Sequence, residues 1–85
     1  MTQKEHEELT SMREILLIAI QREEEAYAFY LRARPSARTP VEADMFTRLA
    51  AQEAQHKKDL EDQLAEINAQ LEIDRALSYD VGKDS

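Results

Sequence analysis

Apolar residues recur along the chain at alternating steps of three and four, the spacing of one face of a helix in a bundle. In the first half, this face holds Leu9, Met12, Leu16, Ala19, Glu23, Ala26, Tyr30 and Ala33. In the second half, it holds Phe46, Leu49, Glu53, His56, Leu60, Leu64, Ile67 and Leu71, with one extra residue between Leu60 and Leu64. These two faces, called the seams below, predict an all-α fold: two helices in an antiparallel hairpin.

Capping residues set the predicted helix starts. Ser11 and Glu14 have the spacing of a capping box and predict a first helix over about 11–34, with residues 1–9 polar and frayed. Pro35 ends this helix at or before Arg34. Thr39, followed by a proline at the first helical position, predicts the start of a second helix over about 40–74.

The C-terminal end is less regular in sequence. A short third helix near 75–79 is an alternative to a simple end of the second helix. We expect a single domain over 1–76 and a mobile tail over 77–85, because Gly82 lies there among polar residues. This tail is also a candidate targeting segment.

Composition supports the helical prediction and excludes several chemistries. Strong helix formers occupy 53 of the 85 positions, and β-branched residues only 11. The absence of cysteine excludes disulfides, cysteine-ligated metals and a thiol nucleophile. Because so small a chain rarely supplies a sufficient hydrophobic core, we expect it to self-associate into a four-helix bundle.

Net charge bears on the partners. The chain carries −7, of which −6 lies in residues 41–85. An acidic surface disfavours nucleic acid and favours cations. The longest apolar run, over 15–20, is far shorter than the roughly 20 residues that span a bilayer. No basic segment followed by a long apolar one opens the sequence, so we expect a cytoplasmic protein without membrane contact.

Three ionisable residues interrupt the seams: Glu23, Glu53 and His56. Burying a lone carboxylate costs several kcal/mol unless a partner or cation compensates it. In a hairpin that turns near residues 37–38, facing positions sum to about 75, which places all three at one level. A Glu from one helix and Glu-x-x-His from another are half the ligands of a di-iron or di-manganese bundle site. Two copies of the chain would complete the set, and the imidazole favours iron, manganese or zinc.

The spacing of these residues also carries a resemblance. Glu23 precedes Tyr30 by seven residues, and the Glu-x-x-His motif begins at Glu53, thirty residues after Glu23. This pattern, over roughly 9–72, resembles the rubrerythrin-type half-ferritins of the ferritin-like superfamily, and most closely the encapsulated ferritins, which are encapsulin cargo.

The resemblance implies a di-iron ferroxidase centre shared by two subunits, with Glu23, Glu53 and His56 binding iron and Tyr30 beside the centre. It also implies dimers packed into a ring, such as a decamer, inside an encapsulin shell. Glu25 matches an acidic position associated with metal access. Arg22 stands where that pattern has an acid.

Other residues have plainer interpretations. Tyr30 is equally typical of a core aromatic, and Glu24 and Glu25 of a solvated or inter-dimer acidic patch. Lys57 and Lys58 are interpreted as a solvated face, and His6 as part of the polar leader. The apolar residues Leu17, Ile18 and Ile20 suggest a second protein interface.

Three functions remain open from sequence. The first is a ferroxidase that oxidises Fe(II) for storage in a separate shell, using oxygen or peroxide. The second is a rubrerythrin-like peroxidase, which without cysteine would need an external reductant. The third is a structural hairpin that dimerises and pairs its polar seam residues only to fix register.

Overall fold

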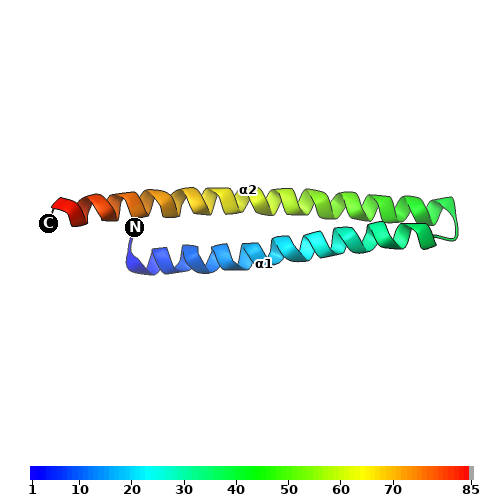
Figure 1. Ribbon diagram of the computed structural model, residues 1–85, viewed down its shortest axis with the longest axis horizontal. Coiled ribbons are helices and arrows are strands. Elements are labelled where there is room, and N and C mark those ends of the chain that lie inside the picture. Colours follow the sequence, from blue (N-terminus) through cyan, green and yellow to red (C-terminus); the bar gives the residue numbers. More distant parts are fainter. Residues whose placement is uncertain (85) are drawn as a thin grey trace.

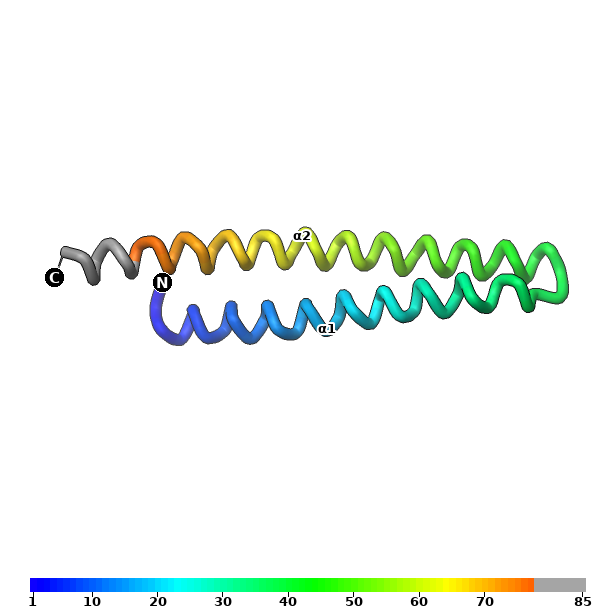
Figure 2. Tube along the Cα trace, viewed as in Figure 1, coloured from blue at the N-terminus to red at the C-terminus, as the bar shows by residue number. Residues whose placement is uncertain are grey.

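The protein is a hairpin of two long antiparallel helices (Figure 1). The computed structural model describes the backbone of residues 1–84 and the side chains of residues 1–77. Helix α1 is Gln3–Ala33, the short 3-10 helix η1 is Arg34–Ser36, and helix α2 is Pro40–Asp84. The two helices lie side by side along a rod of 69 × 15 × 14 Å (Figure 2). The prediction of an all-α hairpin is confirmed.

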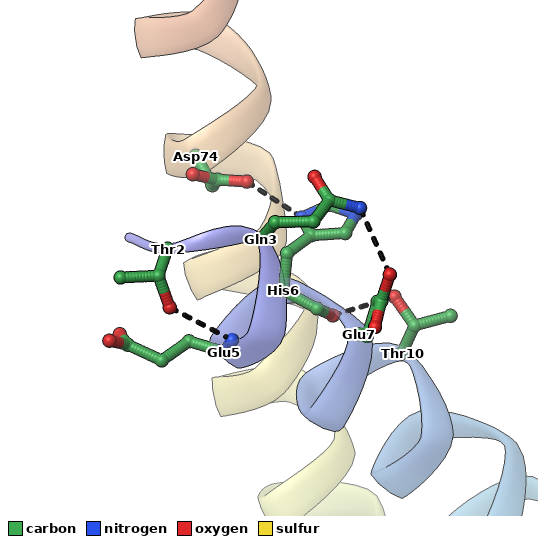
Figure 3. Close-up of polar contacts among 7 residues, drawn as sticks. All are labelled: Thr2, Gln3, Glu5, His6, Glu7, Thr10 and Asp74. Carbon is green, nitrogen blue, oxygen red and sulfur yellow. Dashed lines mark hydrogen bonds and ion pairs between the residues drawn. The ribbon is translucent and has the colours of Figure 1, made fainter.

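Helix α1 begins much earlier than predicted. Thr2 is its N-cap, and the Thr2 Oγ1 accepts a hydrogen bond from the Glu5 amide at 3.1 Å (Figure 3). The predicted start near residue 11 and the frayed segment 1–9 were therefore wrong. Thr2-x-x-Glu5 has the same capping-box spacing as Ser11-x-x-Glu14, and the first box starts the helix. This first turn is tied to α2 because His6 Nδ1 lies 2.7 Å from Asp74 Oδ2.

The link between the helices follows the predicted signals. Helix α1 ends at Ala33, just before Pro35, and the Ala37 amide donates to the Arg34 carbonyl at 3.0 Å. The Thr39 Oγ1 accepts a hydrogen bond from the Glu42 amide at 3.1 Å, as an N-cap does. The predicted cap and start of the second helix are confirmed.

The end of the second helix was predicted wrongly. Helix α2 continues to Asp84 as one element, so it does not stop near residue 74, and residues 75–79 do not form a separate third helix. No proline interrupts this part, and Ala76 and Leu77 are good helix formers. Residues 77–84 of the expected mobile tail thus belong to α2. The predicted targeting role of this tail depends on side chains from residue 78 onward, which lie outside the described residues.

The interior of the hairpin is small. Among residues 1–77, the buried hydrophobic side chains are Ala50, Ile67 and Leu71. The accessible surface is 6679 Å², whereas a compact monomer of 9.8 kDa exposes about 5,200 Å². Large hydrophobic residues lie exposed along both helices, among them Met12, Ile15, Leu17, Ile18, Phe29, Leu31, Met45, Ile73 and Leu77. Two helices alone leave a large apolar surface uncovered.

Within residues 1–84, no helix combines the length and the apolar character needed to cross a lipid bilayer.

The Thr39 cap gives a prediction for stability. Replacing Thr39 with alanine leaves the Glu42 amide without its side-chain acceptor. We expect the free energy of unfolding to fall by about 1 kcal/mol, measured by urea titration of far-UV circular dichroism. Thr47→Ala is the control, because the Thr47 hydroxyl bonds a carbonyl inside α2 and caps no helix. An equal loss in both variants would contradict the assigned role of Thr39.

Candidate metal centre

Three potential metal ligands meet halfway along the hairpin. Glu23 comes from α1, and Glu53 and His56 come from α2, one helical turn apart. One ligand atom from each side chain lies within 4.8 Å of the others. We call these residues the Glu–Glu–His cluster. The structure brings together the three polar seam residues that the sequence singled out.

The distances within the cluster are longer than hydrogen bonds. His56 Nδ1 lies 3.6 Å from Glu23 Oε2 and 3.7 Å from Glu53 Oε2. N–H···O hydrogen bonds in proteins are about 2.7–3.2 Å long. By contrast, donors about 2.1 Å from one ion are separated by about 3.0–4.2 Å. Both imidazole–carboxylate spacings therefore suit a shared cation better than direct pairing.

One oxygen of the cluster is left without a partner. Glu23 Oε2 is buried and accepts no hydrogen bond. An unsatisfied buried acceptor costs about 1–3 kcal/mol, and more when it is charged. A cation held by Glu23, Glu53 and His56 would compensate this oxygen. Two carboxylates and one imidazole are also a donor set that suits iron, manganese or zinc, so the residues present fit such an ion.

His56 does not occupy the seam position that the sequence predicts for it. Its side chain is 58% exposed, against 24% for Glu23 and 19% for Glu53. Its neighbour Lys57 is half-buried and takes the position facing α1. The less exposed positions of α2 alternate by three and four without interruption through 50, 53, 57, 60, 64, 67, 71 and 74, so the step after Glu53 is four and leads to Lys57, which leaves His56 at one edge. The cluster therefore opens to the side of the hairpin that we call the His56 flank.

The register between the helices also differs from prediction. Among residues 1–77, three polar contacts of 4 Å or less between charged or imidazole side chains cross the hairpin: His6–Asp74, Glu23–His56 and Glu24–Lys57. Their residue numbers sum to 80, 79 and 81, not to about 75. Side chains on a helix lean toward its N-terminus. In antiparallel helices this lean shifts the two sets of side chains in opposite directions, which raises the sum by a few residues.

A second cross-helix pair lies directly beside the cluster. Lys57 Nζ is 3.0 Å from Glu24 Oε1, and this hydrogen bond and charge raise the pKa of the Lys57 ammonium. The interpretation of Lys57 as part of a solvated face left out this partner across the hairpin. Because Glu24 and Lys57 follow Glu23 and His56 by one residue each, they lie on the other side of the hairpin, the Lys57 flank.

A surface hollow opens on this flank. Its lining residues are Glu24, Tyr27, Glu53, Ala54, Lys57 and Glu61. We call it the Lys57 hollow. Since Glu53 belongs both to this hollow and to the Glu–Glu–His cluster, the two are joined at one carboxylate. No pattern in the sequence signals the hollow, because it depends on the pairing of the two helices.

The other predicted site residues lie apart from the cluster. Tyr30 is half-buried, two helical turns from Glu23, and its ring meets Phe29 edge-on at 5.5 Å. Glu25 is exposed and accepts a hydrogen bond from Gln21 Nε2 at 3.4 Å. Roles for Tyr30 beside the centre and for Glu25 in metal access stay predictions. His6 is not in a frayed leader but pairs with Asp74 (Figure 3).

Comparison with known proteins adds one finding. The family model described as Rubrerythrin matches residues 14–81, which is most of the chain and includes the whole cluster. Comparison with curated proteins and comparison with solved structures each gave no match.

Proposed function

Because this chain belongs to the rubrerythrin family of the ferritin-like superfamily, we propose that it is a ferroxidase whose di-iron site is shared by two copies of the chain. Family membership implies iron binding, and the Glu–Glu–His cluster is the candidate place for it. The observation that carries the proposal is the buried Glu23 Oε2, which has no hydrogen-bond partner and lies 3.6 Å from His56 Nδ1. Its charge needs a cation.

The incomplete ligand set supports a shared site. One hairpin offers two carboxylates and one imidazole, half of what a di-iron bundle site uses. His56 faces outward, where a second copy related by a two-fold axis could bring the same three residues. The pair would then hold four carboxylates and two imidazoles around two ions. Such a dimer is a four-helix bundle.

The surface of the His56 flank supports the same arrangement. On α1, the side away from Glu24 carries Ile15 and Phe29, which are two heptads apart and exposed. On α2, Met45 precedes His56 by three turns, and Leu77 follows it by three heptads; both are exposed as well. A partner that covers this face would bury the apolar surface that the single hairpin leaves in water.

The chemistry assigned to these residues is charge compensation. Fe(II) is the substrate, and two Fe(II) ions would together give two electrons, which with two protons reduce one dioxygen to hydrogen peroxide or one hydrogen peroxide to two waters. The Glu23 and Glu53 carboxylates would stabilise Fe(III) more than Fe(II), because the attraction grows with the charge of the ion. His56 would supply a ring nitrogen as ligand, and the net charge of −7 concentrates cations near the protein.

Iron storage requires a further partner. A hairpin about 15 Å wide encloses no space for a mineral, even when two copies pack together. We propose that dimers assemble into a ring and that oxidised iron is stored inside a separate shell of the encapsulin type. The protein would then work in the cytoplasm within that compartment.

Two assays test the ferroxidase proposal against its rivals. Purified protein with Fe(II) in air should show rapid growth of Fe(III) absorbance and consumption of oxygen, well above the rate without protein. Rapid loss of peroxide with an external reductant, combined with negligible oxidation of Fe(II) in air, would instead select the peroxidase. A protein that binds no Fe(II), Mn(II) or Zn(II) in equilibrium dialysis would be the structural hairpin, and both catalytic proposals would fail.

A further inference from the structure

The Lys57 hollow offers an approach to the cluster that the shared site leaves open. In the proposed dimer a second copy covers the His56 flank, which closes the exposed side of the cluster. The hollow lies on the opposite flank and has the Glu53 carboxylate in its wall. A cation that enters from this flank reaches a metal ligand without passing between the two subunits.

The charges of the hollow suit a cation, but one is already present. Glu24 and Glu61 supply carboxylates in addition to Glu53, and Lys57 supplies an ammonium paired with Glu24 at 3.0 Å. The Glu24 carboxylate is therefore already paired with a positive charge of this chain, the Lys57 ammonium. An incoming divalent ion has to compete with Lys57 for Glu24, and it is repelled while the ammonium stays in place.

We propose that the Lys57 hollow is the route by which divalent cations reach Glu53, and that Lys57 restricts this route by occupying Glu24. This inference rests on the proposed metal site and adds the means of access to it. It assigns access to Glu24 and Glu61 on the Lys57 flank, and not to Glu25, which is turned outward toward Gln21. Lys57 acts through the carboxylates around it, so it is a residue that controls access and not a ligand.

The test follows Co(II) association with the full-length protein by stopped-flow absorbance. Lys57→Gln removes the ammonium and keeps most of the side-chain length. We expect Co(II) to bind about threefold or more faster than to the parent at low ionic strength, with the gain shrinking in high salt. Lys58→Gln is the matched control: it makes the same change of charge one residue on, at an exposed position outside the hollow.

A double-mutant cycle separates occupation of Glu24 from a general effect of charge. If Lys57 acts by holding Glu24, the gain from Lys57→Gln should largely disappear in a Glu24→Gln background. Lys57→Arg keeps the charge and should keep the slow rate of the parent. Circular dichroism melting curves that match the parent show that each variant is folded.

Each outcome of these experiments either supports the proposed route or overturns it. Equal rates for Lys57→Gln and Lys58→Gln, or an undiminished gain in the Glu24→Gln background, would overturn the route. Glu53→Ala separates this failure from that of the metal site. If Glu53→Ala loses Co(II) at equilibrium while Lys57→Gln matches its control, the site stands and only the route is wrong. If Glu53→Ala keeps Co(II), the site itself is wrong, and the route falls with it.

Discussion

Replacing Glu53 with alanine should abolish Fe(II) oxidation and weaken metal binding at least about a hundredfold. Loss of an outer residue that only orients a metal ligand already costs 10–100-fold in affinity, and Glu53 is proposed as a ligand. In a two-fold dimer each substitution also removes two carboxylates, one from each chain. Equilibrium dialysis against Fe(II) without oxygen measures the affinity, and oxygen consumption measures the activity.

The matched control for this prediction is Glu66→Ala. Glu66 is an exposed glutamate on the same helix, and it belongs neither to the cluster nor to the Lys57 hollow. It should leave affinity and activity close to those of the parent. Without metal, Glu53→Ala should be at least as stable as the parent. The substitution removes the Glu53 carboxylate, whose negative charge lies beside the Glu23 carboxylate and its unpaired oxygen. If Glu53→Ala retained all the metal that the parent binds, the Glu–Glu–His cluster would be excluded as the metal site.

The fold was predictable because its signals are local. The helical spacing of apolar residues is enough to predict the seams. Thr39 and the proline after it are enough to predict the start of α2. The start of α1 was missed although Thr2 and Glu5 give the same local signal as Ser11 and Glu14. Residues 3–8 lack apolar periodicity, and their link to α2 is the polar contact of His6 with Asp74. Hydrophobic pattern alone does not predict such a contact.

The site was predictable in its members but not in its orientation. Spacing placed Glu23 near Glu53 and His56, and the structure brings the three together. Whether His56 or Lys57 faces α1 depends on whether the step after Glu53 is three or four residues, and both steps are compatible with a helical face when the sequence is considered alone. The contact of Glu24 with Lys57 follows from this position of Lys57 facing α1. It depends also on the direction of the two side chains, each of which points toward the N-terminus of its own helix. These are properties of two helices in contact, which the sequence of either helix does not contain.

The exposure of His56 connects this geometry to assembly. His56, the proposed metal ligand, is 58% exposed in the single chain, so its site is shielded from water only when a partner covers it. The apolar residues on the same flank are also exposed, so one partner could cover both His56 and this apolar surface. Metal binding and self-association are therefore expected to be coupled: each should strengthen when the other is present, by the same factor.

Substitution of Ile15 by glutamate tests this coupling. Ile15 is 62% exposed on the side of α1 away from Glu24, so the proposed dimer would bury the new carboxylate without a partner. We expect the dimer dissociation constant to rise at least about thirtyfold, on the order of 2 kcal/mol, measured by analytical ultracentrifugation. Affinity for Fe(II) should fall in the same variant although all six proposed ligands remain.

Leu17→Glu is the control for this substitution. Leu17 is an exposed apolar residue of the same helix, and because it lies one heptad before Glu24 it is on the side of α1 away from the His56 flank. It should leave both the basic dimer and its metal affinity intact, even if it disturbs contacts between dimers in a ring. If Ile15→Glu remained dimeric, the second copy would have to lie on another face. If it became monomeric but bound Fe(II) as tightly as the parent, one hairpin would be a complete site, and sharing between subunits would be excluded.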